Sequence, residues 1–426
     1  METAEIETRV EEMARKARHA SLALATVPRK DKDRMLKALA DLLESSASTL
    51  MEENRKDLEA GKAAGLSNAL LDRLSLSQDR LSGMAGGVRE VAGLDDPVGE
   101  VLETTERPNG LVIRKIRVPI GVVGIIFESR PNVTVDCAAL CLKSGNACIL
   151  RGGKEAFHTN TALAALIARA LRESSLPGDS VQLVPTTDRY ALHCLLKMDA
   201  YIQCIIPRGG ESLIRFVAEN SLIPVIKHYK GVCTLYIDKA ANLEMAKKLV
   251  VNAKCQRPGV CNAIENLLLH RETAGKFLPE IARALAAEGV ELRLDASAAA
   301  IIKQAGDIPF EAATDKDWTE EYLAPILAIK TVPSTEAAIE AINTFGSGHS
   351  DGIVTADEST AQTFLTGVDS ATVYWNASTR FTDGFEFGMG AEIGISTDKL
   401  HARGPMGLKE LCTYKYTITG QGTVKR

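Results

Sequence analysis

Residues 121–133 read Gly-Val-Val-Gly-Ile-Ile-Phe-Glu-Ser-Arg-Pro-Asn-Val, and this stretch decides the fold. The unbroken apolar run over 122–127 is typical of a strand buried on both faces of a parallel sheet. Polar and turn residues follow it, and the amphipathic segment 133–143 predicts a helix. A buried strand followed by a helix is the repeating unit of a doubly wound α/β sheet.

The same alternation continues along the chain. Strands are predicted at 147–150, 181–184, 202–206 and 223–227, with helices at 157–173, 188–196 and 211–218 between them. A second series begins at Val232, with strands at 232–237, 263–269, 326–331, 351–355 and 371–375 and helices at 242–256, 272–287, 335–344 and 358–366. The sequence therefore predicts two consecutive α/β domains.

Two regions lie outside these series. The first ninety or so residues have apolar side chains at helical spacing among charged ones, which predicts surface helices around a larger body. Residues 100–118 and 412–420 alternate apolar and polar side chains, as half-buried strands do. We expect these two segments to pair as a projecting flap, because added strands are a common means of contact between subunits.

Composition excludes several classes of protein. The 426 residues are 45% hydrophobic and 25% charged with a net charge of −5, which is typical of a soluble globular protein of two or three domains. The chain has no basic block, so nucleic-acid and anionic-membrane partners are disfavoured. The apolar stretch 118–127 is about half of what spans a bilayer. The acidic N-terminus and nine scattered cysteines, without disulfide or paired zinc spacing, predict a cytoplasmic protein with no metal site.

Two glycine turns follow predicted strands and open predicted helices. The glycines let the backbone approach a ligand, and the free N–H groups and cations suit an anion at the carboxyl end of a strand. Neither turn has the G-x-G-x-x-G pattern, and each alone could be an ordinary surface turn. The pair indicates an extended, multiply charged ligand such as a dinucleotide. The candidate residues are Arg151, Gly152, Gly153, Lys154, Arg208, Gly209, Gly210 and Ser212.

Residues 252–263 carry two thiols around a Pro-Gly turn. Cys261 lies near Lys254 and Arg257 in the sequence, and cations favour the thiolate that acts as a nucleophile. The alternative is a small buried side chain, which is the interpretation we give to Cys255 on the predicted helix. His349, on the small-residue loop 346–351, is a candidate donor to a carboxylate or phosphate, or merely an exposed loop residue.

Four segments together resemble the gamma-glutamyl phosphate reductase family of the aldehyde dehydrogenase superfamily: 121–133, 252–263, 346–351 and 390–408. The resemblance implies NADPH-dependent reduction of L-glutamate 5-phosphate to the semialdehyde with release of phosphate, the second step of proline biosynthesis from glutamate. It implies an NADP-binding domain over 1–100 and 119–230, a catalytic domain over 231–402, and an oligomerisation flap formed by 101–118 and 403–426. A homo-oligomer is expected, and the lability of the acyl phosphate makes association with a glutamate kinase plausible.

The resemblance also assigns residues. Cys261 becomes the nucleophile that forms a thioester, and Glu321 matches the residue that holds the nicotinamide ribose. Lys143 begins the motif before the cofactor strand, Arg151 stands where a Lys contacts the adenosine ribose, and Lys154 stands near the acidic residue of NAD-using relatives. A cation there favours the 2′-phosphate of NADPH. Arg130 or Asn132 occupies the region of the oxyanion-stabilising Asn, and both stay open.

One departure from oxidising relatives concerns water. Those enzymes have a Glu that activates the hydrolytic water, whereas this chain has no Glu between Glu219 and Glu244. A reductase needs no such base, because hydrolysis would waste the thioester. For the anionic ends of the substrate the candidates are Arg257, His349 and Arg403, with Arg130 as a further one. Reduction of another acyl phosphate or acyl-CoA, thiol hydrolysis and a silent binding role are the competing hypotheses.

Overall fold

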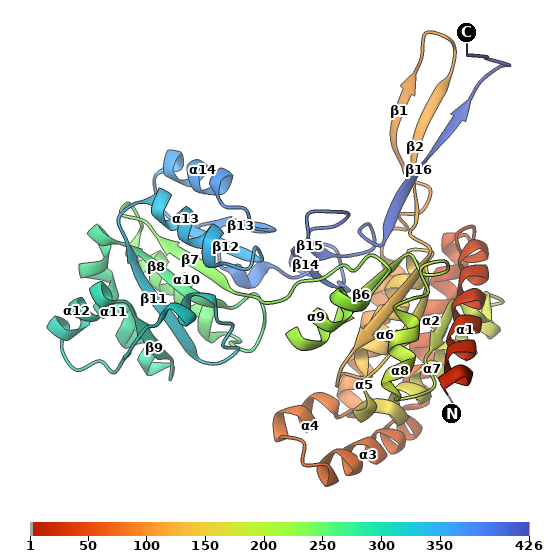
Figure 1. The fold of residues 1–426 in the computed structure, drawn as a ribbon, viewed down its shortest axis with the longest axis horizontal. Helices are drawn as coiled ribbons and strands as arrows, with labels where there is room; N and C mark the ends of the chain where they lie inside the picture. Colours follow the sequence, from red (N-terminus) through yellow and green to blue (C-terminus); the bar gives the residue numbers. More distant parts are fainter. Residues whose placement is uncertain (1–2, 426) are drawn as a thin grey trace. The chain divides into compact units, whose positions relative to one another are not determined.

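The computed structural model describes residues 3–425, which divide into two compact units. Of these residues, unit 1 comprises 3–227, 388–394 and 406–425, and unit 2 comprises 228–387 and 395–405. Each unit is built on a parallel sheet with helices on its faces (Figure 1). The fold class predicted from the sequence is confirmed.

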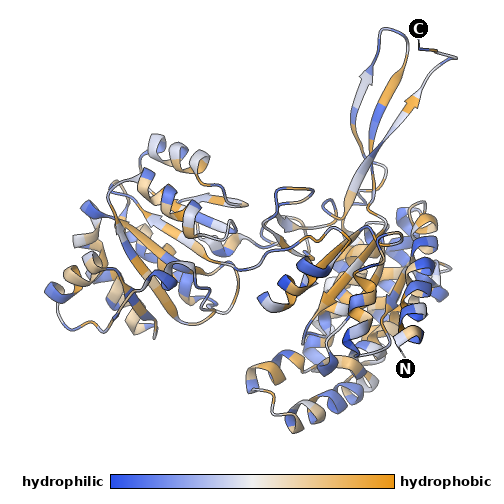
Figure 2. Cartoon of the chain, in the orientation of Figure 1, coloured by the Kyte–Doolittle hydropathy of each residue, from blue (hydrophilic) through white to orange (hydrophobic). Residues whose placement is uncertain are grey.

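The sheet of unit 1 has the strand order β5-β4-β3-β6, and every neighbouring pair is parallel. All six residues of the central strand β3 are buried, and Figure 2 shows the apolar strands enclosed by helices with polar outer faces. The strands are β3 (Val122–Phe127), β4 (Ala147–Arg151), β5 (Val181–Leu183) and β6 (Cys204–Arg208). The helices between them are α6 (Asn132–Lys143), α7 (Phe157–Glu173), α8 (Arg189–Leu195) and α9 (Glu211–Asn220).

The segment predicted as a strand at 223–227 is not one. It forms a single parallel bridge, between Ile205 and Val225, at the edge of β6. Pro224 accepts a hydrogen bond from Ile205 N through its carbonyl but has no N–H to donate, so the ladder stops after one bridge.

The N-terminal helices cover one side of this unit. Ile6, Val10 and Ala14 of the first helix are buried in one cluster with Val122 of β3 and Ile149 of β4. The five helices are α1 (Thr3–Leu24), α2 (Arg29–Ser45), α3 (Ala47–Ala63), α4 (Asn68–Leu74) and α5 (Gln78–Gly93). The helices therefore complete the core of unit 1, as their apolar spacing predicts.

A three-stranded antiparallel sheet projects from unit 1 (Figure 1). Its central strand β2 (Val112–Pro119) pairs with β1 (Val101–Glu106) on one side and with β16 (Cys412–Thr419) on the other. The two segments with alternating patterns thus lie in one sheet. We call this sheet the flap.

Unit 2 has a seven-stranded parallel sheet with the order β10-β9-β11-β8-β7-β12-β13. Its strands are β7 (Cys233–Ile237), β8 (Ile264–His270), β9 (Glu291–Leu294), β10 (Glu311–Ala312), β11 (Ile326–Val332), β12 (Ser350–Val354) and β13 (Thr372–Trp375). Its helices are α10 (Leu243–Cys255), α11 (Arg271–Ala287), α12 (Ala296–Ala305), α13 (Thr335–Phe345) and α14 (Glu358–Gly367). The short strands β14 (Gly394–Ser396) and β15 (Gly404–Met406) lie where the chain passes between units. Across residues 3–425, none of the helices combines the length and the apolar character needed to cross a membrane.

Candidate active site

The nucleophile candidate lies on a short loop of unit 2. Asn242 caps the start of α10 through a hydrogen bond from Met245 N (3.0 Å), and the helix ends at Cys255. The segment from Gln256 to Asn262, which we call the nucleophile loop, then leads into β8. Cys261 is half-buried near the end of this loop. The loop therefore fixes the sulfur at the start of a central strand.

The other thiols are poor nucleophiles. Seven of the nine are buried, and only Cys255 and Cys261 are half-buried. Burial raises the pKa of Cys204 to about 12, and it also raises the pKa of Cys233 and of Cys255. A thiol whose pKa is raised by burial supplies little thiolate at neutral pH.

Gly231 lies directly against Cys261. A Cβ atom on Gly231 would be 2.2 Å from the carbonyl oxygen of Cys261 and 2.6 Å from its Cα. The N–H of Gly231 donates to Glu321 Oε1 (2.8 Å). The backbone of Gly231 thus lies between Glu321 and Cys261, so these two predicted residues belong to one site. Whether Glu321 holds a ribose there stays a prediction.

A buried ion pair lies behind the nucleophile loop. Lys254 Nζ is 2.5 Å from Glu265 Oε2, and both side chains are fully buried. The other oxygen of Glu265 accepts a hydrogen bond from Leu323 N (3.1 Å), two residues beyond Glu321. Burial raises the pKa of Glu265 to about 7, although Lys254 opposes the shift. The pair links the last turn of α10 to the loop that carries Glu321, and the sequence analysis did not find it.

His349 lies at the start of β12 in a buried polar network. Its Nδ1 is 2.8 Å from Ser350 Oγ, which is 2.7 Å from Thr382 Oγ1, and Cys233 Sγ lies 3.6 Å from the same nitrogen. Burial, and then the neighbouring His228, lowers the pKa of His349 to about 3. The ring is therefore neutral at physiological pH, so a charged contact with a substrate anion is not available to it. Its buried Nε2 has no partner among residues 3–425, and a role as a neutral donor stays a prediction.

The predicted substrate arginines differ in their surroundings. Arg257 is exposed on the nucleophile loop. Arg403 Nη1 is 3.0 Å from Asp369 Oδ1, and Nη2 donates to the Asp369 carbonyl (2.9 Å), so a carboxylate already neutralises it. Arg130 is exposed, and Asn132 donates to Asp136 Oδ2 (2.8 Å) at the start of α6. Both belong to unit 1, and their roles at the sulfur stay predictions.

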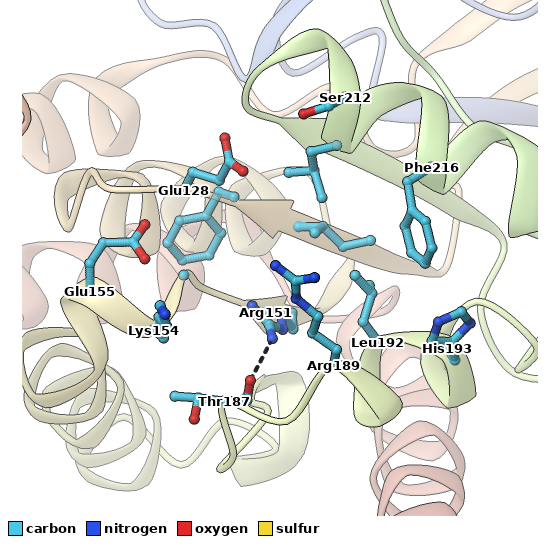
Figure 3. A pocket seen from close by; sticks show the side chains of 14 residues that line it. Glu128, Arg151, Lys154, Glu155, Thr187, Arg189, Leu192, His193, Ser212 and Phe216 are labelled. Atoms are coloured by element: carbon cyan, nitrogen blue, oxygen red, sulfur yellow. Dashed lines mark hydrogen bonds between the residues drawn. The ribbon is translucent and has the colours of Figure 1, made fainter. Parts of the chain in front are cut away.

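Unit 1 contains a pocket of about 460 Å³ at the carboxyl ends of its strands. It includes predicted residues from both glycine turns and three cationic side chains, two of which, Arg151 and Arg189, lie close together (Figure 3). Thr187 accepts a hydrogen bond from Arg151 Nη2 through its carbonyl (3.1 Å). The residues that line it include Glu128, Arg151, Gly153, Lys154, Arg189 and Ser212. Arg189 was missed by the sequence analysis, although it opens α8 after β5 and the rule applied to the other two turns also covers this position.

The two glycine turns are tightly packed. A Cβ on Gly152 would be 2.3 Å from Asn160 Nδ2, and one on Gly209 would be 2.5 Å from Glu128 Oε2. The N–H of Gly210, at the start of α9, donates to Glu128 Oε2 (3.0 Å). The Glu128 carboxylate of the protein thus accepts a hydrogen bond from one of the N–H groups that we expected to face a ligand.

Two further candidates lie away from this pocket. Lys143 is fully buried, pairs with Asp33 and donates to the Ala92 carbonyl (2.8 Å), and it is not among the residues that line the pocket. The structure thus places Lys143 in the core of unit 1, and its role in cofactor binding stays a prediction. The guanidinium of Arg208 points toward Gly394, where a Cβ would be 2.3 Å from its Nη1.

Comparisons with known proteins show the family to which the chain belongs. The model of the "Aldehyde dehydrogenase family" matches residues 3–305 and 312–415. Gamma-glutamyl phosphate reductase of Opitutus terrae is 63% identical over 97% of each chain, and that of Moorella thermoacetica is 52% identical over 98% of this chain and 99% of the relative.

Solved structures agree as well. The crystal structure of gamma-glutamyl phosphate reductase from Thermotoga maritima has a TM-score of 0.95 at 43% identity and covers 98% of this chain and 100% of that one. A glyceraldehyde-3-phosphate dehydrogenase of Methanocaldococcus jannaschii complexed with NADP, 17% identical with a TM-score of 0.67 over 97% of this chain and 95% of that one, shares the fold. The chain belongs to the aldehyde dehydrogenase family and, within it, to the gamma-glutamyl phosphate reductases.

Proposed function

We propose that the chain reduces L-glutamate 5-phosphate to L-glutamate 5-semialdehyde with NADPH and releases phosphate. The observation that carries the proposal is the contact of Gly231 with Cys261 on one side and Glu321 on the other. This contact supports a single site for a nucleophilic sulfur and a ribose-binding carboxylate. The 63% identity to a named gamma-glutamyl phosphate reductase supports the substrate.

Cys261 would act as the nucleophile. Its sulfur attacks the acyl carbon, the bond from that carbon to the phosphate oxygen breaks, and a thioester remains on the enzyme. NADPH, when bound, supplies the hydride that reduces this thioester. Collapse of the resulting hemithioacetal releases the aldehyde and returns the sulfur as a thiolate. Segment 227–231 contains no carboxylate to activate a water, and reduction through a thioester needs no such base.

The pocket of unit 1 fits a phosphorylated dinucleotide. The Nε of Arg151 is buried without a partner among residues 3–425. Lys154 and Arg189 add positive charge to the same pocket. We propose that Arg151, Lys154 and Arg189 hold the adenosine 2′-phosphate.

The flap supports a homo-oligomer. Its residues Val101, Tyr414, Tyr416 and Ile418 are between 49 and 61% exposed, which is unusual for apolar side chains in such number on one small sheet. We propose that a second copy of the chain covers this sheet, because edge strands of this kind otherwise invite uncontrolled pairing.

The test uses the reverse reaction, because the semialdehyde is easier to handle than the acyl phosphate. Glutamate semialdehyde and phosphate are supplied with NADP⁺ or NAD⁺, and the reduced cofactor is followed by absorbance. We expect NADP⁺ to be preferred about tenfold or more, and Lys154→Glu to remove most of that preference. Lys197→Glu is the matched surface control, because Lys197 lies outside the pocket lining and donates only to the Asn220 carbonyl. A preference for NAD⁺ would overturn the cofactor proposal, and no reduction with either cofactor would overturn the proposed substrate.

A further inference from the structure

Hydrogen bonds connect Arg380 and the turn that carries it to both ends of the nucleophile loop. It lies in a short 3₁₀ turn, η4 (Thr379–Phe381). At the start of the loop, Gln256 Oε1 accepts hydrogen bonds from Arg380 Nε (3.0 Å) and Nη2 (2.8 Å). At its end, the Asn262 carbonyl accepts from Thr379 Oγ1 (2.7 Å), and Asn262 Nδ2 is 3.4 Å from the Arg380 carbonyl. These contacts hold the guanidinium beside the loop that carries Cys261.

Buried hydrogen bonds within unit 2 hold this turn in place. Thr382, directly after the turn, is buried and accepts a hydrogen bond from Asn262 Nδ2 through its carbonyl (2.8 Å). The Thr382 hydroxyl lies 2.8 Å from Tyr374 OH and 2.7 Å from Ser350 Oγ. Thr379 and Thr382, on either side of Arg380, are both buried. The core of unit 2 therefore fixes the backbone from which the Arg380 side chain extends.

Arg380 and Arg257 carry positive charge that the protein does not neutralise by ion pairing. The only side chain that accepts hydrogen bonds from the Arg380 guanidinium is the neutral amide of Gln256, and within residues 3–425 neither arginine forms an ion pair with a carboxylate. Burial, and then Arg257, lowers the pKa of Arg380, while Cys261 and then the Asp383 carboxylate act in the opposite sense without forming an ion pair with it. One guanidinium group on the loop that carries the sulfur and a second one held beside that loop can together bind an anion. By contrast, Arg403 is already paired with Asp369.

The chemistry of the substrate selects which anion. In the proposed substrate the phosphoryl group is separated from the carbon that Cys261 attacks by a single oxygen, whereas three carbons separate that carbon from the α-carboxylate group. A cation fixed to the nucleophile loop therefore meets the phosphoryl group first. We propose that Arg380, with Arg257, binds the phosphoryl group as it leaves, and binds inorganic phosphate in the reverse direction. This inference rests on the proposed function.

The proposed residues assist one bond exchange. In the forward direction the bond from Cys261 Sγ to the acyl carbon forms, the bond from that carbon to the phosphate oxygen breaks, and the departing phosphate carries the electron pair. In the reverse direction a phosphate oxygen attacks the thioester carbon, and Cys261 leaves as a thiolate. The guanidinium groups stabilise the negative charge on phosphate in both directions.

The test separates phosphate from the carboxylate. In the reverse reaction of the full-length protein, inorganic phosphate and glutamate semialdehyde are varied independently for wild type, Arg380→Gln, Arg380→Lys and Arg257→Gln. We expect Arg380→Gln to raise the KM for phosphate by about tenfold or more, with a change of less than about twofold in the KM for the semialdehyde. Arg380→Lys keeps the charge, and its KM for phosphate should lie between those of wild type and Arg380→Gln. Arg283→Gln, a surface arginine that donates to the Ala305 carbonyl, is the control.

A rapid-mixing measurement distinguishes failure of this inference from failure of the proposed function. Mixing wild type with semialdehyde and NADP⁺ should give a burst of reduced cofactor as the thioester forms, before phosphate is needed. Arg380→Gln should keep this burst and lose the phosphate-dependent steady state. A raised KM for the semialdehyde with an unchanged KM for phosphate would assign the arginines to the α-carboxylate and overturn the inference. Absence of any cofactor reduction in wild type would instead overturn the proposed function. If Arg380→Gln does not fold, the same KM and burst measurements on Arg257→Gln test the inference, because Arg257 is exposed.

Discussion

Gly231→Ala tests how closely the nucleophile is packed. The new Cβ would lie 2.2 Å from the Cys261 carbonyl oxygen, 2.6 Å from its Cα and 2.7 Å from its Cβ, whereas ordinary contacts begin at 3.4 Å. Relief of this overlap requires a displacement of roughly 1 Å, and the atoms in the way are mainly backbone, which cannot rotate aside. A displacement of that size near reacting atoms lowers kcat by about 100-fold.

The assay must separate lost activity from lost stability. Overpacking of this kind destabilises proteins by about 1–3 kcal/mol, so urea unfolding is measured beside the kinetics to show that the variant is folded at the assay temperature. Gly259→Ala is the matched control in the same loop, because its Cβ would meet only the Leu323 carbonyl oxygen at 3.6 Å. We expect it to keep kcat within about twofold. A folded Gly231→Ala variant with the kcat of wild type would refute the reasoning.

Three further predictions follow from charges and surfaces. Lys254→Met leaves the buried Glu265 carboxylate unpaired and should lower the free energy of unfolding by about 3–5 kcal/mol at a pH where Glu265 is ionised. Because Lys254 no longer lowers the pKa of Glu265, this carboxyl takes up a proton more readily in the variant, and the loss should shrink as the pH falls. The double variant with Glu265→Gln should recover part of this loss in urea titrations, and no recovery would contradict the account. Burial raises the pKa of Asp351 to about 7, above its unfolded value of about 3.9, so this group destabilises the native state increasingly as pH rises from about 4 to 7. Asp351→Asn should therefore gain stability over wild type by a few kcal/mol at pH 8 and little at pH 4, whereas a difference independent of pH would contradict the shift. Ile418→Lys on the flap should shift the protein toward monomer in sedimentation experiments, and an unchanged mass would show that the flap makes no contact between copies.

The local sequence predicted most of the fold because buried parallel strands leave a direct signal. The run 122–127 coincides with β3. The signal failed where one residue changes the backbone chemistry, as at Pro224, whose missing N–H ended the predicted strand. It also failed at β9, whose four residues alternate exposed and buried positions in a segment too short to show a period.

The candidate site was predicted in part for a different reason. Resemblance of motifs identified Cys261, and the turn rule identified Arg151 and Lys154. The Lys254–Glu265 pair joins the last turn of a helix to a strand across a loop, and no periodic pattern reports such a contact. Arg380 lies more than a hundred residues after Gln256 in the chain, so only the folded structure brings them together.

Phosphate dependence of the reverse reaction tests the central claim most directly. Reduction of NADP⁺ by glutamate semialdehyde is measured with and without phosphate in wild type, Cys261→Ser and Cys255→Ser, where Cys255 is the other half-buried thiol. The account predicts sustained turnover only with phosphate, its loss in Cys261→Ser, and near wild-type rates in Cys255→Ser. Equal turnover without phosphate, or activity that survives in Cys261→Ser, would contradict a reductase that works through a thioester on Cys261.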